Sequence, residues 1–348
     1  MVIGRVFDPL FLEHGESWHP ENRTRLEAVV ARLQDSGLWD ELEEVPALPA
    51  DEEQLAWLHT PDYIEDLRLI CQSGGGALDP DTVATWATFG AAIVAAGSCM
   101  WATRLVVEGG VDSALCLVRP PGHHALPQRG MGFCFFNNAA LAAEMARALG
   151  VERVALLDWD VHHGNGSQEM FYHRGDVLYV SIHQHGIFPG TGSVDEVGVD
   201  AGSGRTINIP LPGAAMDGHY LRAWDQIVIP AVRSYQPGMI IVSAGYDGHY
   251  SDPLTASHLL TTDGYYRLAE RTQALADELC EGRLCVILEG GYAPEALSRG
   301  VENTVLAMLG RPIHEPDPGQ PQVHPMALSR VDEYLDQAIA GHRARLQL

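Results

Sequence analysis

Short apolar runs rich in valine and isoleucine alternate with longer segments of helical periodicity along most of this chain. Strands that are apolar on both faces are typical of a parallel sheet covered by helices on both sides, since both faces of such strands are buried. The sequence therefore predicts an α/β fold with a mainly parallel central sheet between two helical layers. The predicted strands are 114–118 (ALCLV), 153–158 (RVALLD), 177–182 (VLYVSI), 206–211 (TINIPL), 239–245 (MIIVSAG) and 284–291 (LCVILEGG).

Helical periodicity fills the segments between these runs and much of the N-terminal third. A proline-rich connection at about 310–323 precedes a last helix predicted at about 329–344. Neither an internal repeat nor a shift in composition divides the chain, so a single domain over residues 1–348 is predicted. The other predicted helices are 23–33, 61–71, 80–108, 138–149, 218–235, 262–280 and 294–309.

The composition argues against several classes of function. Of 348 residues, 46% are hydrophobic and the formal net charge is -24, whereas nucleic acids and anionic membranes are bound by positively charged surfaces. We identify no secretory leader and no apolar stretch as long as a membrane span. The six cysteines form no CxxC pair, which favours buried free thiols in a reducing compartment. The sequence thus predicts a cytoplasmic protein that binds neither nucleic acid nor membrane.

Five of the predicted strands are each followed directly by a polar cluster. The clusters are RPPGHH, DWDVHHGN, SIHQHG, AGYDGHYSD and EGGY, after the strands that begin at 114, 153, 177, 239 and 284. Burying unpaired charge costs several kcal/mol per group, so the needs of folding alone do not explain this arrangement. Open parallel sheets bind ligands at the carboxyl ends of their strands, where loops converge. The five clusters therefore predict a single site at that edge.

The DWDVHH cluster has the composition of a metal site. Asp158, Asp160 and His162 alternate, so in an extended chain they project to one side. Asp160 and His162 offer one oxygen and one nitrogen, as zinc or Fe(II) prefers. A catalytic metal needs three protein ligands and an open position, and Asp247 in SAGYDGH is the strongest candidate for the third. A lone DxD would more readily be a turn or a helix cap, but the complete motif favours a metal.

A second histidine pair, His123 and His124, follows a rigid Pro-Pro-Gly segment. Hydrolysis at a metal needs a base to deprotonate water and an acid to protonate the leaving amine. Two imidazoles with different partners can adopt different protonation states, and Asp158 and Asn165 are natural partners. By itself the pair is equally consistent with two satisfied polar histidines.

Aromatic residues lie close to these clusters in the sequence. Tyr292 follows EGG at a strand end, where its phenol could donate a hydrogen bond to a developing oxyanion. The equally good alternative is a tyrosine packed at a helix start. Phe133 in GFCFF and Phe188 in IFPGTG could wall a narrow apolar channel, although each taken alone fits the core better.

Taken together, the clusters resemble the histone deacetylase superfamily, zinc-dependent deacetylases that include acetylpolyamine amidohydrolases and bacterial histone deacetylase-like amidohydrolases. The resemblance extends from His19-Pro20-Glu21 to Tyr292, most of the chain. It implies a single-domain, three-layer α/β/α sandwich of the arginase and deacetylase type. The motifs RPPGHHA, GFCFFNN, DWDVHHGNG, FPGTG, SAGYDGHYSDP and LEGGY occur in the family's order.

The resemblance assigns two ion sites. Asp160, His162 and Asp247 match the ligands of the catalytic metal, Zn2+ with Fe2+ as an alternative. A structural K+ or Na+ site is matched mostly through backbone oxygens. Its residues are Asp158, Asp160, His162, Ser181 and Ile182.

The resemblance also assigns the catalytic groups. His124 matches the general base and acid, with Asn165 behind it, and His123 matches its partner, with Asp158 behind it. Tyr292 matches the tyrosine that polarises the scissile carbonyl. Retention of this tyrosine predicts an active deacetylase.

Substrate-binding positions follow in the same way. Gly132, Phe133 and Phe188 match the acyl-lysine tunnel, and Arg25 matches an arginine below the metal. Leu254 stands where polyamine-selective relatives place an acidic gatekeeper, which favours acyl-lysine-like substrates.

Two further details of the resemblance concern the subclass. Asn165, where class I enzymes usually carry aspartate, resembles class II. The short SIHQHGIFPGTG loop lacks residues that class II enzymes often have there, which leaves the rim geometry open.

The sequence therefore predicts a zinc-dependent amidohydrolase that removes acetyl or other acyl groups from acyl-lysine peptides or acylated amines. An acetylpolyamine deacetylase is the main alternative, and homo-oligomers occur among bacterial relatives. An arginase-type ureohydrolase would need a dinuclear manganese cluster with more carboxylates than the sequence offers. A non-catalytic acyl-lysine binder is the last alternative.

Overall fold

The structure is a computed structural model that describes residues 1–254, 257–317, 319 and 321–346. Its centre is an eight-stranded sheet in the order β2-β1-β5-β10-β9-β6-β7-β8, and every pair of neighbours is parallel. The six predicted strands are all present, which confirms the α/β class. The strands are β1 (Ile3–Val6), β2 (Glu43–Val45), β5 (Ser113–Cys116), β6 (Val154–Asp158), β7 (Val177–Gln184), β8 (Thr206–Leu211), β9 (Met239–Ala244) and β10 (Leu284–Leu288).

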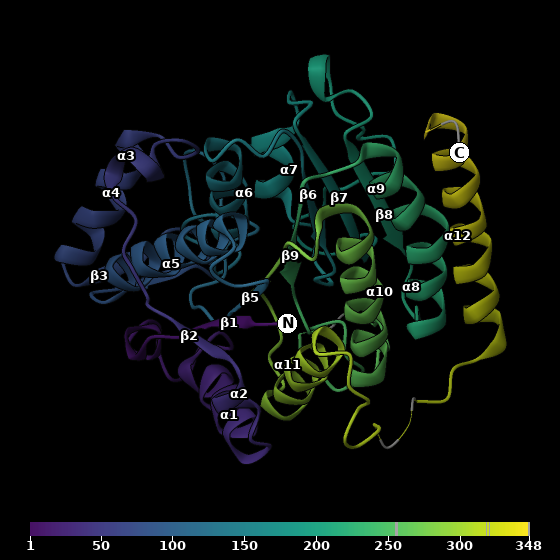
Figure 1. The fold of residues 1–348 in the computed structure, drawn as a ribbon, viewed down its shortest axis with the longest axis horizontal. Helices are drawn as coiled ribbons and strands as arrows, with labels where there is room; N and C mark the ends of the chain where they lie inside the picture. Colours follow the sequence, from purple (N-terminus) through teal and green to yellow (C-terminus); the bar gives the residue numbers. More distant parts are fainter. Residues whose placement is uncertain (255–256, 318, 320, 347–348) are drawn as a thin grey trace.

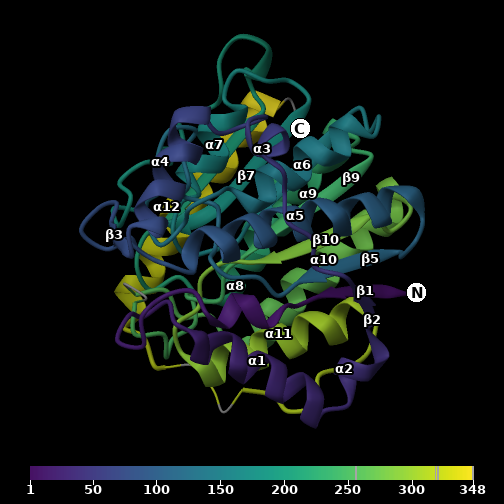
Figure 2. The ribbon, with the colours of Figure 1, turned by 90° about the vertical axis from the view of Figure 1, so that its left-hand side faces the viewer.

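Helices cover both faces of the sheet (Figure 1). Figure 2 shows α5 and α6 on one side of the strands and α1 and α11 on the other. The strands between them are buried at every position except in β2, as expected for a doubly covered parallel sheet. The helices are α1 (Arg23–Asp35), α2 (Leu38–Glu41), α3 (Glu52–Leu55), α4 (Pro61–Gln72), α5 (Thr88–Glu108), α6 (Asn138–Ala148), α7 (Asn165–Phe171), α8 (Asp217–Ala223), α9 (Ile229–Tyr235), α10 (Thr262–Cys280), α11 (Pro294–Met308) and α12 (Pro325–Leu346).

Several predicted boundaries were wrong for local reasons. The strands β1 (IGRV) and β2 (EEV) were not predicted, because neither is a continuous apolar run. The predicted helix at 80–108 begins only at Thr88, since β-branched Val83 and Thr85 form β4 (Val83–Thr85), which pairs antiparallel with β3 (Gly75–Ala77).

Two other helices also differ from prediction. The segment 218–235 divides into α8, a turn of π-helix at Trp224–Val228, and α9. Pro230 lies in the first turn of α9, and its missing N–H removes one helical hydrogen bond at this join. Helix α12 begins at Pro325 rather than near 329, since proline is well tolerated in a first turn.

Helix α5 corrects the expectation that no apolar stretch reaches the length of a membrane span. It has 21 residues and a mean hydropathy of 1.5 over its most apolar window. Most of that window is buried, and the helix packs on α6, β5 and β10. At Gly97 a Cβ atom would lie 2.1 Å from the Ala50 nitrogen, so the preceding chain crosses α5 in direct contact with its backbone. Its apolar composition is therefore accounted for by packing in the core.

The six cysteines are buried free thiols, as predicted. The five strands that carry polar clusters are neighbours in the sheet, in the order β5, β10, β9, β6, β7. Because all of them run in the same direction, their carboxyl ends meet at one edge, and the clusters converge there as predicted.

Candidate active site

Three side chains from two strand ends form a compact group of metal-ligand type. One ligand atom each from Asp160, His162 and Asp247 lies within 4.8 Å of the others. His162 Nδ1 is 3.2 Å from Asp160 Oδ1 and 3.0 Å from Asp247 Oδ2. The Gly290 N–H donates to Asp160 Oδ2 at 2.9 Å, and the Val161 N–H donates to Asp247 Oδ1 at 3.0 Å. Backbone donors thus orient both carboxylates, as expected around a metal.

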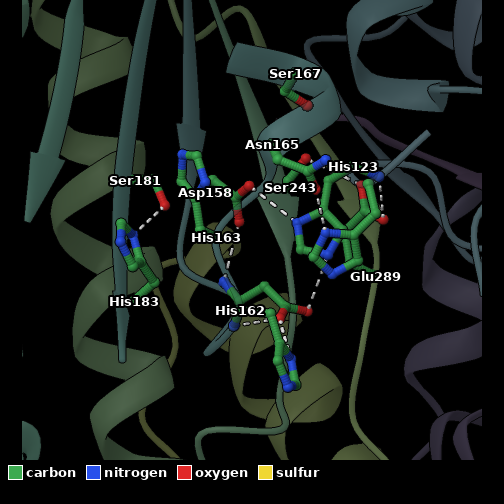
Figure 3. Close-up of polar contacts among 12 residues, drawn as sticks. His123, Asp158, His162, His163, Asn165, Ser167, Ser181, His183, Ser243 and Glu289 are labelled. Carbon is green, nitrogen blue, oxygen red and sulfur yellow. Dashed lines mark hydrogen bonds and ion pairs between the residues drawn. The ribbon is translucent and has the colours of Figure 1, made fainter. Parts of the chain in front are cut away.

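The alternation in the DWDVHH motif suggested an extended chain, but the motif is extended only in its first part. Strand β6 ends at Asp158, and the chain then turns. Asp158 Oδ1 accepts from the Asp160 N–H at 3.1 Å, and Asp160 Oδ1 accepts from the His162 N–H at 2.9 Å. Two successive side-chain-to-backbone turns of this kind direct Asp158 away from the ligand group. Figure 3 shows Asp158 with His123 on one side of this turn and His162 on the other.

The ligand group fits a divalent cation. Asp160 and Asp247 are at most 1% exposed, so their negative charge is almost completely removed from water. Burial disfavours a charged His162, yet Asp247 and Asp160 raise its pKa to about 10, because the two carboxylates require a positive charge between them. Two carboxylate oxygens and one imidazole nitrogen are donors suited to Zn2+ or Fe2+.

The two neighbouring histidines have different partners, as predicted. His123 Nδ1 lies 3.1 Å from Asp158 Oδ2, and His124 Nδ1 lies 2.9 Å from Asn165 Oδ1. The two rings are adjacent, with centroids 3.9 Å apart. Asp158 also accepts from the Tyr179 hydroxyl at 3.0 Å, so it is held from a second side.

These partners give the two imidazoles opposite pKa shifts. Burial disfavours a charged His123, but the surrounding carboxylates, led by Asp158, outweigh burial and raise its pKa to about 10. Burial, together with His123 and His162, lowers the pKa of His124 well below its ordinary value. One ring is therefore held charged and the other neutral.

Glu289 organises the histidine loop, a role that was not predicted from the sequence. Its Oε2 accepts from the N–H groups of Gly122 at 2.7 Å and His123 at 3.1 Å. Its Oε1 accepts from the Ser243 hydroxyl at 3.0 Å. Figure 3 shows Glu289 beside His123. A carboxylate directly after the apolar run of β10 was the available signal, because such a group must have buried partners.

Tyr292 is held by two residues that sequence reasoning did not connect with it. Asp252 Oδ2 accepts from the N–H groups of Tyr292 at 2.5 Å and Ala293 at 3.1 Å. The Arg25 guanidinium lies 4.9 Å from the centre of the Tyr292 ring and donates to the Gly291 carbonyl. Burial raises the pKa of Tyr292 well above its ordinary value despite the nearby Arg25, so the phenol remains a hydrogen-bond donor.

Arg25 belongs to a buried ion cluster beneath the site. It donates to Glu21 Oε1 at 2.8 Å, and Arg119 donates to both carboxylate oxygens of the same Glu21. All three side chains are at most 1% exposed. The cluster joins the HPE segment to the RPP segment, which explains why charged residues stand in both motifs.

A cavity of about 220 Å³ leads to the histidines and Tyr292. Gly132 has φ +56°, and a Cβ atom there would lie 2.6 Å from the His124 ring and 2.8 Å from the Phe188 ring. Only glycine fits this wall. Asp81 also borders the cavity and had not been predicted. The lining residues are Asp81, His124, Gly132, Phe133, His162, Phe188, Leu254 and Tyr292.

The residues assigned to a monovalent cation lie at the paired ends of β6 and β7. Asp158 is in register with Ser181, and Ile182 follows in the same strand. The Ser181 hydroxyl lies 2.8 Å from His183 Nδ1. Figure 3 marks this contact with a dashed line. Binding of K+ or Na+ there stays a prediction.

Comparisons with known proteins decide the family. Residues 19–308 match the histone deacetylase domain. This chain belongs to the histone deacetylase family. Enzymes of this family are deacetylases of the amidohydrolase type and are generally metal-dependent, and the donor group described above agrees with that chemistry.

Individual histone deacetylase relatives match nearly the whole chain. A probable deacetylase of Archaeoglobus fulgidus is 39% identical over 330 residues, which cover 93% of this chain and 91% of that protein. A histone deacetylase-like amidohydrolase of Pseudomonas aeruginosa is 42% identical over 295 residues, 84% of this chain and 76% of that protein. The crystal structure of the HDA15 HD domain has a TM-score of 0.87 and 34% identity, covering 99% of this chain and 98% of that chain.

Metal content tests the ligand group. Elemental analysis should find about one divalent ion per chain, the number that a site with three protein ligands holds. Asp247→Asn should lower the metal content severalfold, because it removes one of two carboxylate charges. Asp225→Asn, in an exposed ion pair with Arg271, is the matched control and should leave the content unchanged. Full metal content in Asp247→Asn would contradict the assignment.

Proposed function

We propose that this deacetylase is a zinc-dependent amidohydrolase that removes acetyl or other acyl groups from acyl-lysine-type amides. The observation that carries the proposal is the meeting of three kinds of group in one cavity. A metal-ligand triad, a pair of differently partnered histidines and a half-buried tyrosine lie at the end of an aromatic-walled passage. Metal-assisted hydrolysis of an amide requires these groups together.

Asp160, His162 and Asp247 would hold the zinc ion. The bound ion supplies a Lewis acid for the acyl carbonyl and for water. His124 is the general base, because its Nδ1–H donates to Asn165 Oδ1 and leaves Nε2 free to accept the proton of water. The Tyr292 phenol donates to the oxyanion that forms at the carbonyl. Protonated His124 then returns its proton to the leaving amine.

The second histidine has a supporting role in this proposal. His123 faces Asp158 through Nδ1, so its positive charge is retained in the cleft during the reaction. It lies against the His124 ring and lowers the basicity of that ring. His124 therefore gives up its proton readily once the amine has formed.

The passage supports an acyl-lysine substrate. Phe133 and Phe188 border the cavity, and aromatic walls suit the methylene chain of lysine. Leu254 is neutral at the position where an acidic gatekeeper would select polyamines. Asp81 also borders the cavity, and the presence of this acidic residue favours acetylpolyamine as the second candidate.

Three further parts of the proposal concern the setting of the enzyme. The backbone at the ends of β6 and β7 binds K+ or Na+ as a structural ion. Reduced, buried cysteines support a cytoplasmic location. The enzyme uses neither nucleic acid nor membrane as a partner, in keeping with its net charge of -24.

A matched pair of steady-state assays tests the substrate class. The zinc-loaded enzyme should turn over a short acetyl-lysine peptide, and a hydroxamate inhibitor should block the reaction. N-acetylputrescine should be a poor substrate, because Leu254 offers no negative charge to pair with its free ammonium group. Turnover of acetylputrescine alone would contradict the acyl-lysine assignment and favour a polyamine deacetylase.

The role of Tyr292 is tested by Tyr292→Phe. Removing one oxyanion donor typically lowers kcat by on the order of 10²–10³, while metal content and the melting temperature should change little. Tyr266→Phe removes a phenol far from the cavity, one that donates to the Arg311 carbonyl, and serves as the control. Wild-type kcat in Tyr292→Phe would rule out this role.

A further inference from the structure

The loop that carries Phe188 is held by side chains rather than by regular structure. We call residues 187–196 the rim loop. The Phe188 ring meets the His124 ring edge to face, with centroids 5.0 Å apart, and lies 6.4 Å from the His162 ring. Phe188 is 39% exposed, so packing around it cannot fix its position alone. The restraint has to come from elsewhere in the loop.

Glu196 supplies that restraint at the far end of the rim loop. Its Oε1 accepts from the Ser193 N–H at 3.0 Å, and its Oε2 accepts from the Gly192 N–H at 3.2 Å. The same Oε2 accepts from Gln168 Nε2 at 2.6 Å. Gln168 lies on α7, directly after the histidine-rich turn. The pair Gln168–Glu196, which we call the clasp, therefore ties the loop to the core of the site.

The clasp also sets the direction of the neighbouring hydrogen bonds. Because the Gln168 amide nitrogen faces a carboxylate, its Oε1 must accept, and it does so from Asn208 Nδ2 at 2.7 Å. His163 Nε2 lies 3.1 Å from the same Oε1 and therefore donates to it. His163 Nδ1 lies 2.8 Å from the Thr191 hydroxyl, so the same ring also contacts the rim loop. The rim loop is thus tied a second time, next to Phe188.

The fit around this second tie is close. Gly192 has φ +85°, and a Cβ atom there would lie 2.5 Å from His183 Nε2 and 2.6 Å from His163 Cγ. The Gly192 carbonyl accepts from His183 Nε2 at 3.0 Å. The loop therefore lies directly on the turn that presents the predicted metal ligand His162.

We propose that Gln168 and Glu196 are positioning residues that fix Phe188 as one wall of the substrate passage. Without the clasp, neither the hydrogen bonds of Glu196 nor the contact between His163 and Thr191 keeps its orientation. Phe188 then no longer has a fixed position over the His124 ring. The inference depends on the proposed function only where substrate binding is concerned. The order of the rim loop can be measured without any substrate.

The test uses a single substitution and a double variant in which a second substitution compensates for the first. Gln168→Glu brings two carboxylates face to face and should raise KM and the hydroxamate Kd by about tenfold, with a smaller change in kcat. The double variant Gln168→Glu/Glu196→Gln restores an amide opposite a carboxylate and should recover part of the lost affinity. Recovery is incomplete because the amide nitrogen introduced at position 196 cannot accept from the Gly192 N–H. Glu169→Gln alters the adjacent, exposed residue of α7 and is the matched control. Unchanged KM in Gln168→Glu, or no recovery in the double variant, would overturn the proposal.

Two further measurements separate positioning from general stability. Hydrogen exchange of the rim-loop backbone should be faster in Gln168→Glu than in wild type and slower in the double variant than in Gln168→Glu, with unchanged metal content. The hydrogen-exchange result does not depend on whether acyl-lysine is the substrate. In a double-mutant cycle, Phe188→Ala and Glu196→Ala should be non-additive in KM, because Glu196 acts through Phe188. Unchanged exchange or additive effects would show that the clasp does not position Phe188.

Discussion

Negative charge buried at one edge of a parallel sheet determines how the rest of this structure is arranged. Asp158, Asp160, Asp247 and Glu289 are at most 1% exposed and lie at the ends of three neighbouring strands. A buried carboxylate without compensation costs several kcal/mol, so each requires donors or a positive charge. Backbone N–H groups and imidazoles supply part of this compensation. The divalent cation that we propose for Asp160, His162 and Asp247 would complete it, so that the fold and the proposed chemistry depend on one another.

The end of β10 links the separate parts of the site. Glu289 holds the histidine loop through its side chain, and its carbonyl accepts from Arg25. The next residue, Gly290, donates its N–H to Asp160, and two residues later the Tyr292 N–H donates to Asp252. One short segment thus sets the relative positions of the histidine loop, Asp160 and Tyr292, which carry the proposed general base, metal ligand and oxyanion donor. A displacement of about 1 Å in such a site can cost two orders of magnitude in rate, so this shared support matters for catalysis.

The sequence predicted the parts of the molecule that depend on local pattern. Apolar runs identified six strands of the sheet, and the parallel arrangement then brought Asp160, His162 and Asp247 to one edge. Strand β2, at one edge of the sheet, was not predicted, because one apolar residue in three carries no periodic signal. The Gln168–Glu196 clasp was not predicted from the sequence for a different reason. Its members are 28 residues apart on different elements, and each resembles an ordinary polar surface residue until the fold brings them together.

Anomalous X-ray diffraction from crystals of the metal-loaded enzyme, measured on both sides of the zinc absorption edge, tests the central claim most directly. The account predicts one strong peak, bonded to Asp160, His162 and Asp247 and open toward the cavity lined by Tyr292. A second cluster of donor type, His123, Cys134 and Glu289, lies buried nearby. A peak at that cluster, or two metal peaks sharing the edge, would contradict the account.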